Sequence, residues 1–187
     1  SLKNVNFHEV TFGTKGQKMV DLSFDSTSKA WSQRIILQLC KNEKEALSSR
    51  YGLSQPREGE NGGKRNLELR IENEGVIAKL QELDEVIIDY ATTNSKTLFR
   101  KDLTTEQVRA KYKNILKHKE DGDYNFTIIK VKCPPEEKPT PIKIVDNTNG
   151  TLSTGDFTSL TAGCRVVPVV RFLSLWFMSD TFGLSLQ

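Results

Sequence analysis

The sequence predicts an α+β protein, mainly β, with a small antiparallel barrel and a central two-helix insert. Three observations predict this fold. Short runs that alternate between apolar and polar residues occupy both ends of the chain, as in half-buried strands. The central part instead places apolar residues at helical spacing. Strand patterns then resume, separated by turn signals, and this order favours short antiparallel strands closed into a barrel.

The composition sets the broad class. A chain of 187 residues can build its own core, so we expect a single domain over 1–187. Its net charge of +3 is mild, so nucleic-acid binding would depend on where the charges lie. Cys40, Cys133 and Cys164 are widely spaced and form no Cys-x-x-Cys motif, which predicts reduced thiols in an intracellular protein. No secretory signal or membrane span is recognisable, so no membrane partner is expected.

The N-terminal part predicts four elements in order. Residues 5–12 and 19–24 alternate around a glycine-bounded turn and should form a hairpin. A third strand is predicted over 31–39. The polar segment 41–63 contains a proline and several glycines, which favours a mobile excursion. Residues 64–72 alternate regularly and predict a further strand.

The central insert is predicted over 74–118. In its first helix, 74–91, apolar residues recur three and four positions apart, and Asp84 lies on the same face. The second helix is predicted over 105–118. It begins with a capping-box pattern, in which Thr104 is followed three residues later by a glutamine.

The C-terminal part returns to strands. Residues 125–133 and 142–145 read as strands on either side of a proline-rich loop, and an Asp-Asn-Thr-Asn-Gly turn follows. The closing segment 160–187 predicts a hairpin. Its first strand covers 165–178, and the return strand contains Gly183, where the chain bends or packs closely.

The faces of the closing hairpin depend on strand alternation. Arginines and a proline interrupt its apolar run, which excludes a membrane-spanning helix. In a regular strand, Arg165 and Arg171 share one side, and this side is the candidate binding face. Trp176 has the parity of Phe172 and falls on the opposite side, unless a β-bulge near Ser174 turns it around.

No group of residues predicts catalysis or metal binding. The two histidines, His8 and His118, lie apart and have no nucleophile beside them in the sequence. Asp84, Glu85 and Asp89 lie within one or two helical turns, but such acidic residues are more often a solvated helix face than a metal site. We therefore expect a protein that is not an enzyme and has no cofactor and no metal.

Nucleic-acid binding has more support. Binding of single strands without sequence preference requires cationic groups for the phosphates and aromatic faces for the bases. Basic residues alternate with apolar and aromatic ones in the predicted strands, and Lys130 and Lys132 share a strand face. The candidate contact residues are Trp31, Arg34, Arg65, Lys130, Lys132, Arg165, Arg171 and Trp176. The alternative is a solvated outer face with all aromatics inside, as in a protein-interaction or structural barrel.

A family resemblance agrees with the first interpretation. The stretch 93–112, TNSKTLFRKDLTTEQVRAKY, resembles a block in single-stranded DNA-binding proteins of bacteriophages and nucleocytoplasmic large DNA viruses. The lysine-rich strand over 125–133, the Asn-Gly turn and the Leu-Trp-Phe end of the closing strand resemble the same family. The resemblance covers most of the chain except 41–63. Leu98 stands where the family commonly has an aromatic residue.

The resemblance implies an OB-like barrel and a protein that coats single-stranded DNA during replication, recombination or repair. Binding would be sequence-tolerant and would weaken with salt, because it depends on phosphate neutralisation and base stacking. The expected location is the nucleus or a viral replication site, with replication proteins as further partners. RNA in place of DNA, and an oligomeric state, stay open.

Overall fold

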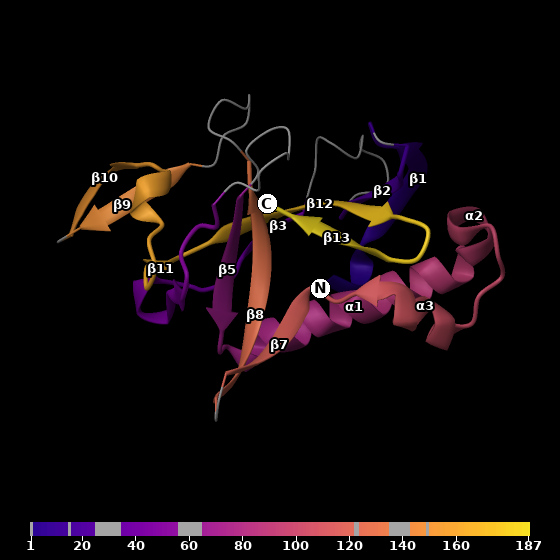
Figure 1. The fold of residues 1–187 in the computed structure, drawn as a ribbon, viewed down its shortest axis with the longest axis horizontal. Helices are drawn as coiled ribbons and strands as arrows, with labels where there is room; N and C mark the ends of the chain where they lie inside the picture. The colour runs from indigo at the N-terminus through magenta and orange to yellow at the C-terminus, as the bar shows by residue number, and fades with distance from the viewer. Residues whose placement is uncertain are drawn as a thin grey trace.

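The computed structural model describes residues 2–14, 16–24, 35–55, 65–121, 124–134, 143–148 and 150–187. In this part of the chain, strands predominate over helices (Figure 1), which confirms the mainly-β α+β class. The strands form three sheets. Their ladders, as far as the described residues show, do not close into a barrel.

The largest sheet has six strands in the order β1-β2-β12-β13-β6, with β3 also paired to β12. All neighbours are antiparallel except β13 and β6. The predicted N-terminal and closing hairpins are both confirmed as β1–β2 and β12–β13. The strands of this sheet are β1 (Asn6–Phe12), β2 (Lys18–Ser23), β3 (Ile36–Gln38), β6 (Tyr112–Lys113), β12 (Val169–Phe177) and β13 (Phe182–Leu186).

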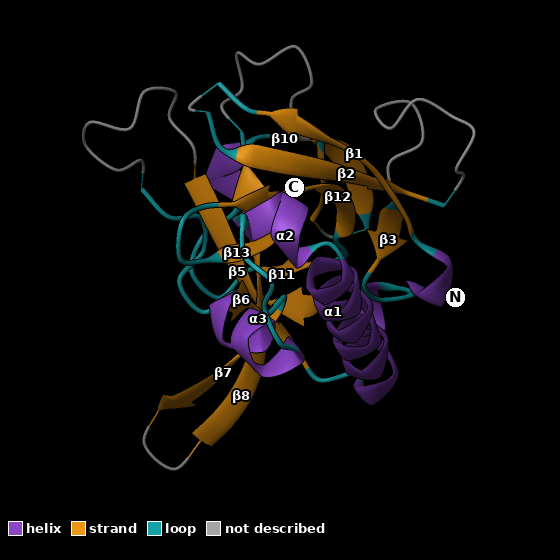
Figure 2. Ribbon diagram, turned by 90° about the vertical axis from the view of Figure 1, so that its right-hand side faces the viewer, coloured by secondary structure: helices purple, strands orange, loops and turns teal. Residues whose placement is uncertain are grey.

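A five-stranded sheet follows the order β11-β4-β5-β8-β7, and β9 and β10 form a separate hairpin. In Figure 1 that hairpin projects at the left, and Figure 2 shows the β7–β8 hairpin projecting downward. Only two residues separate β11 from β12, so one segment serves both large sheets. The bounds are β4 (Leu47–Ser48), β5 (Arg65–Ile71), β7 (Leu116–Asp121), β8 (Tyr124–Cys133), β9 (Ile144–Thr148), β10 (Thr151–Gly155) and β11 (Arg165–Val166).

The α-helices of the described residues are α1 (Glu74–Thr93), α2 (Ser95–Phe99) and α3 (Thr105–Lys111). In Figure 1, α1 and α3 lie at the lower right and α2 lies above them at the right. Short 3₁₀ turns cover Leu2–Asn4, Glu43–Glu45 and Phe157–Ser159. Side-chain caps define where the longer helices begin. Asn73 accepts a hydrogen bond from the Val76 amide, and the predicted capping box of Thr104 and Gln107 is present. No helix in the described ranges has the length and apolarity needed to cross a membrane.

One hydrophobic core joins both large sheets to α1. The helix contributes Leu80, Leu83 and Ile87, which are fully buried. The sheet side contains an aromatic cluster, in which the rings of Phe177 and Phe182 stack with centroids 5.1 Å apart. The three cysteines are free thiols, in agreement with the sequence prediction.

The second predicted helix is too long. The chain leaves the helix after Lys111, and 112–118 contributes to β6 and β7 instead. Tyr112 is extended, with φ −75° and ψ 139°, and pairs with Phe182 of β13. Ile115 and Leu116, the apolar residues after Tyr112, have a spacing that also fits a helix, but they are buried in or beside strand β7. A third helix, α2, was not predicted.

Other segments also differ from the prediction. Within 41–63, which we expected to be an excursion without structure, β4 pairs with both β5 and β11. Residues 56–64 lie outside the described part. Of the predicted strand 31–39, only Ile36–Gln38 is seen as β3, because 25–34 lie outside the description. The first three residues of the predicted Asp-Asn-Thr-Asn-Gly turn, 146–148, are instead paired residues of β9, and β10 was not predicted.

A buried carboxyl group ties α1 to the chain after α3. Asp84 is 6% exposed, and its Oδ1 accepts hydrogen bonds from the Tyr112 hydroxyl at 2.6 Å and the Ile115 amide at 3.2 Å. Burial raises the pKa of Asp84 from 3.8 to about 6, although both hydrogen bonds act in the opposite direction. Asp84 is therefore part of the core and not of a solvated helix face.

This carboxyl should make the protein less stable as the pH rises. Because its folded pKa lies above the unfolded value, its contribution to stability is fully present below the unfolded pKa and is lost as the pH rises through about 6. Asp84→Asn keeps the Oδ1 acceptor and does not ionise. Between about pH 5 and pH 7, the wild type should lose about 1 kcal/mol more unfolding free energy than this variant. Urea unfolding of both proteins at both pH values measures the difference. Equal losses would contradict the buried ionisation of Asp84.

Candidate functional site

Six of the eight candidate contact residues lie in the described part of the chain, whereas Trp31 and Arg34 fall outside it. The six come from four strands. Arg65 belongs to β5, Lys130 and Lys132 to β8, Arg165 to β11, and Arg171 and Trp176 to β12.

A β-bulge in β12 decides which way Trp176 points. Phe172 pairs with Leu186 of β13, but Leu175 pairs with Leu184, so β12 contains one extra residue between these pairs. Such a residue reverses the side on which the following side chains lie. Phe172, Leu175 and Phe177 are consequently all buried.

Arg171 and Trp176 lie on the same face of the sheet, away from the core. Arg171 exchanges two backbone hydrogen bonds with Gln187, at 2.7 and 2.9 Å, and Trp176 pairs with Gly183. Residues 183 and 187 have the same parity in the regular return segment, so their partners share a side. The β-bulge that the sequence analysis left open near Ser174 is therefore present. The placement of Trp176 opposite Arg171, which a regular strand would give, is wrong.

Gly183 allows Trp176 to lie across the sheet. A Cβ at Gly183 would lie 3.1 Å from Cζ2 of Trp176 and 3.2 Å from Cβ of Lys113. Met19 pairs with Trp176 from the other side. We call this surface the tryptophan face and define it as Met19, Lys113, Arg171, Trp176 and Gly183. The close packing expected at Gly183 is confirmed.

Lys132 extends this surface from the other sheet. Its Nζ lies 3.0 Å from Oγ of Ser185, which has the same parity in β13 as Gly183. Lys130 shares the outer face of β8 with Lys132, as the sequence predicted, and pairs with Glu68 of β5. The cationic row on β8 therefore lies next to the tryptophan face.

Arg165 and Arg171 share one side of the closing segment, as predicted. Arg165, Val167 and Val169 are exposed, whereas Val170 is buried. The Arg165 guanidinium also donates hydrogen bonds to the carbonyls of Lys44 at 3.2 Å and Ala46 at 3.5 Å. Arg165 thus lies on the outer side and contacts the backbone just before β4.

Arg65 has a different position. It pairs with Cys133, a buried residue of β8, and so belongs to the core side of its strand. Its guanidinium lies 5.5 Å from the centroid of the Phe157 ring. Arg65 contributes nothing to the tryptophan face.

Sequence reasoning missed two members of the tryptophan face, Met19 and Lys113. The sequence predicts a strand at Met19 but gives no reason to assign it to a binding surface, and it predicts a helix at Lys113. The sequence signal for Lys113 is indirect. Gly183 predicts that another segment packs closely against the return strand, but it does not identify that segment.

Comparison with known proteins places the chain in a family. Residues 60–187, more than half of the chain, match the model of the family of unknown function DUF5871. The chain belongs to this family. The matched region includes Lys113, Arg171, Trp176 and Gly183 of the tryptophan face, whereas Met19 precedes it. Neither the curated proteins nor the solved structures contain a significant match.

The packing of Trp176 on Gly183 can be tested by fluorescence. In a Trp31→Phe background, Trp176 is the remaining tryptophan. Gly183→Val should push the indole off the sheet into water, shift its emission to the red, and cost about 1–3 kcal/mol of unfolding free energy. Gly183→Ala should show a smaller change. Unchanged emission in the folded Val variant would mean that Trp176 does not rest on Gly183.

Proposed function

We propose that the protein binds single-stranded DNA without sequence preference through the tryptophan face and the lysines beside it. The bulge in β12 is the observation that carries the proposal, because it puts Trp176 and Arg171 on one outward face. Trp176 would stack against bases. Arg171, Lys113 and Lys132 would neutralise phosphates.

The energetics favour such a surface despite the mild net charge. Stacking on an aromatic side chain is worth about 1–3 kcal/mol per base and is tolerant of sequence. Trp176 is partly exposed, so part of the indole remains open to a base. Asp21 is an acidic residue of the same sheet. Its carboxylate accepts a hydrogen bond from the Ser174 hydroxyl, so it has a partner within the protein.

The proposal includes an OB-like barrel. Its support is that β11 and β12 together pair with strands of both large sheets, while Lys132 of β8 reaches Ser185 of β13. The bond between these two side chains lies where a barrel would close. The proposed role is the coating of exposed strands in DNA replication, recombination or repair, at a nuclear or viral replication site, without catalysis.

One observation favours a second candidate, a protein-interaction module. Val145 and Leu152 are 65% and 69% exposed. Register places both on the same face of the projecting β9–β10 hairpin, where such residues could contact another protein. Val145→Ser with Leu152→Ser should then abolish partner binding and leave DNA binding unchanged.

Fluorescence anisotropy with labelled oligo-dT tests the DNA-binding proposal. Trp176→Ala should weaken binding by about fivefold or more, from the loss of one stacked base. Arg171→Ala should reduce the steepness with which log K falls with log salt by about 0.7, the amount for one phosphate contact on a single strand.

Two matched controls separate this surface from general effects. Phe12 is 71% exposed and lies on the side of β1 that faces away from the tryptophan face. Phe12→Ala should therefore leave DNA affinity unchanged. Lys79 lies on the exposed side of α1, and Lys79→Ala should not change the salt dependence. Absence of an anisotropy change at micromolar protein and low salt would overturn the proposed function.

A further inference from the structure

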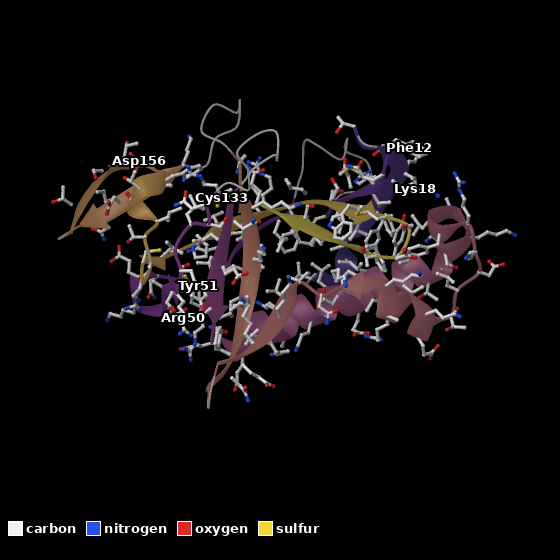
Figure 3. All side chains as sticks on the ribbon, in the orientation of Figure 1. Phe12, Lys18, Arg50, Tyr51, Cys133 and Asp156 are labelled. Atoms are coloured by element: carbon white, nitrogen blue, oxygen red, sulfur yellow. The ribbon has the colours of Figure 1, made fainter. Side chains whose placement is uncertain are left out.

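A hollow lies on the outer face of the five-stranded sheet. Its volume is about 570 Å³, within the range of ligand-binding pockets. The segment after β4 forms one wall, and β5, β7 and β8 form the floor. Figure 3 shows Arg50 and Tyr51 together beside β5. Its lining includes Arg50, Tyr51, Glu68, Arg70, Lys119 and Phe126, and we call this set the arginine-aromatic groove.

Each of the two rings in this groove has a guanidinium over it. Arg50 lies 5.5 Å from the centroid of Tyr51, and Arg70 lies 5.7 Å from that of Phe126. Tyr51 is nevertheless 66% exposed. An exposed ring beside a guanidinium offers a flat surface for a planar base and a positive charge for the group attached to it.

The charge of the lining is positive. Three cationic side chains face one carboxylate, that of Glu68, which pairs with Lys119 Nζ at 2.6 Å. Arg70 also pairs with Glu72 at 2.9 Å, and that carboxylate is largely exposed. This balance complements an anion, and the two rings favour an anion that carries a planar base.

The groove and the tryptophan face lie on one continuous side of the molecule. Arg165 pairs with Ser48, and Ser48 pairs with Arg70, so a single row across the sheet runs from the closing segment into the groove. Along that segment, the outward residues continue from Arg165 to Arg171. At about 3.3 Å per residue, these two arginines are about 20 Å apart.

We infer that the arginine-aromatic groove holds one nucleotide of the same DNA strand that crosses the tryptophan face. The base stacks on Tyr51 or Phe126, and its phosphate lies against Arg70 and Lys119. The inference rests on the proposed function and adds a second contact region to it. A strand, rather than a free nucleotide, is the proposed occupant because the outward residues of 165–171 connect the two regions.

Affinity changes of opposite sign test this inference. Tyr51→Ala should weaken oligo-dT binding about fivefold or more, and Lys119→Gln should reduce the salt dependence by about 0.7. Glu68→Gln should instead tighten binding, because it removes the carboxylate from the lining. Damage to the fold would not raise affinity, so this variant separates recognition from structure. Asp102→Asn, in the exposed loop before α3, is the matched control and should have no effect.

Photocrosslinking with iododeoxyuridine-substituted oligo-dT locates the contact independently. A crosslinked peptide that contains Tyr51 or Phe126 supports the inference. If oligo-dT binds in a Trp176-dependent manner, but the groove variants have no effect and no such peptide forms, the inference fails while the proposed function stands. If thymidine monophosphate binds the groove as tightly as oligo-dT, the occupant is a free nucleotide and the strand path is wrong. If no single strand binds at all, both proposals fall.

Discussion

The extra residue in β12 between Phe172 and Leu175 is the constraint on which the rest of the structure depends. Before it, Val170 and Phe172 fill the core, and after it, Leu175 and Phe177 do so. In a regular strand, the residues after Phe172 would exchange sides, and Trp176 would replace Leu175 and Phe177 in the core. Because β12 pairs with β2, β3 and β13, the bulge sets the faces of the entire large sheet.

The helical insert supports the same surface from inside. Asp84 of α1 holds the Tyr112 hydroxyl and the Ile115 amide, and this contact anchors β6 beside β13. Lys113 follows Tyr112 and therefore points outward, next to Gly183. The buried carboxyl costs stability at neutral pH, since burial raises its pKa. The buried hydrogen bond of Asp84 to Tyr112 thus helps to fix the outward position of Lys113.

The sequence predicts most strands and the start of each long helix, because alternation and capping are local signals. Gly183 and the shared side of Arg165 and Arg171 were predicted for the same reason. The bulge near Ser174 stays an open alternative in the sequence, since large apolar residues occupy both parities of 172–177 and no pattern decides whether an extra residue is present. Tyr112 was assigned to a helix because its spacing from Val108 fits one, whereas pairing with Phe182 decides its conformation. The arginine-aromatic groove could not be predicted, because its residues are far apart in the sequence. Tyr51 and Phe126, for example, come together only in the folded chain.

The fluorescence of Trp176 during DNA binding is the most direct test of whether single-stranded DNA contacts the tryptophan face. A Trp31→Phe protein, titrated with oligo-dT, reports on this side chain alone. Stacking of a base on the exposed part of the indole should quench the emission in parallel with the rise in anisotropy of the labelled oligonucleotide, and salt should reverse both. A rise in anisotropy with unchanged Trp176 emission would show that DNA binds elsewhere, and it would contradict the assignment of the tryptophan face.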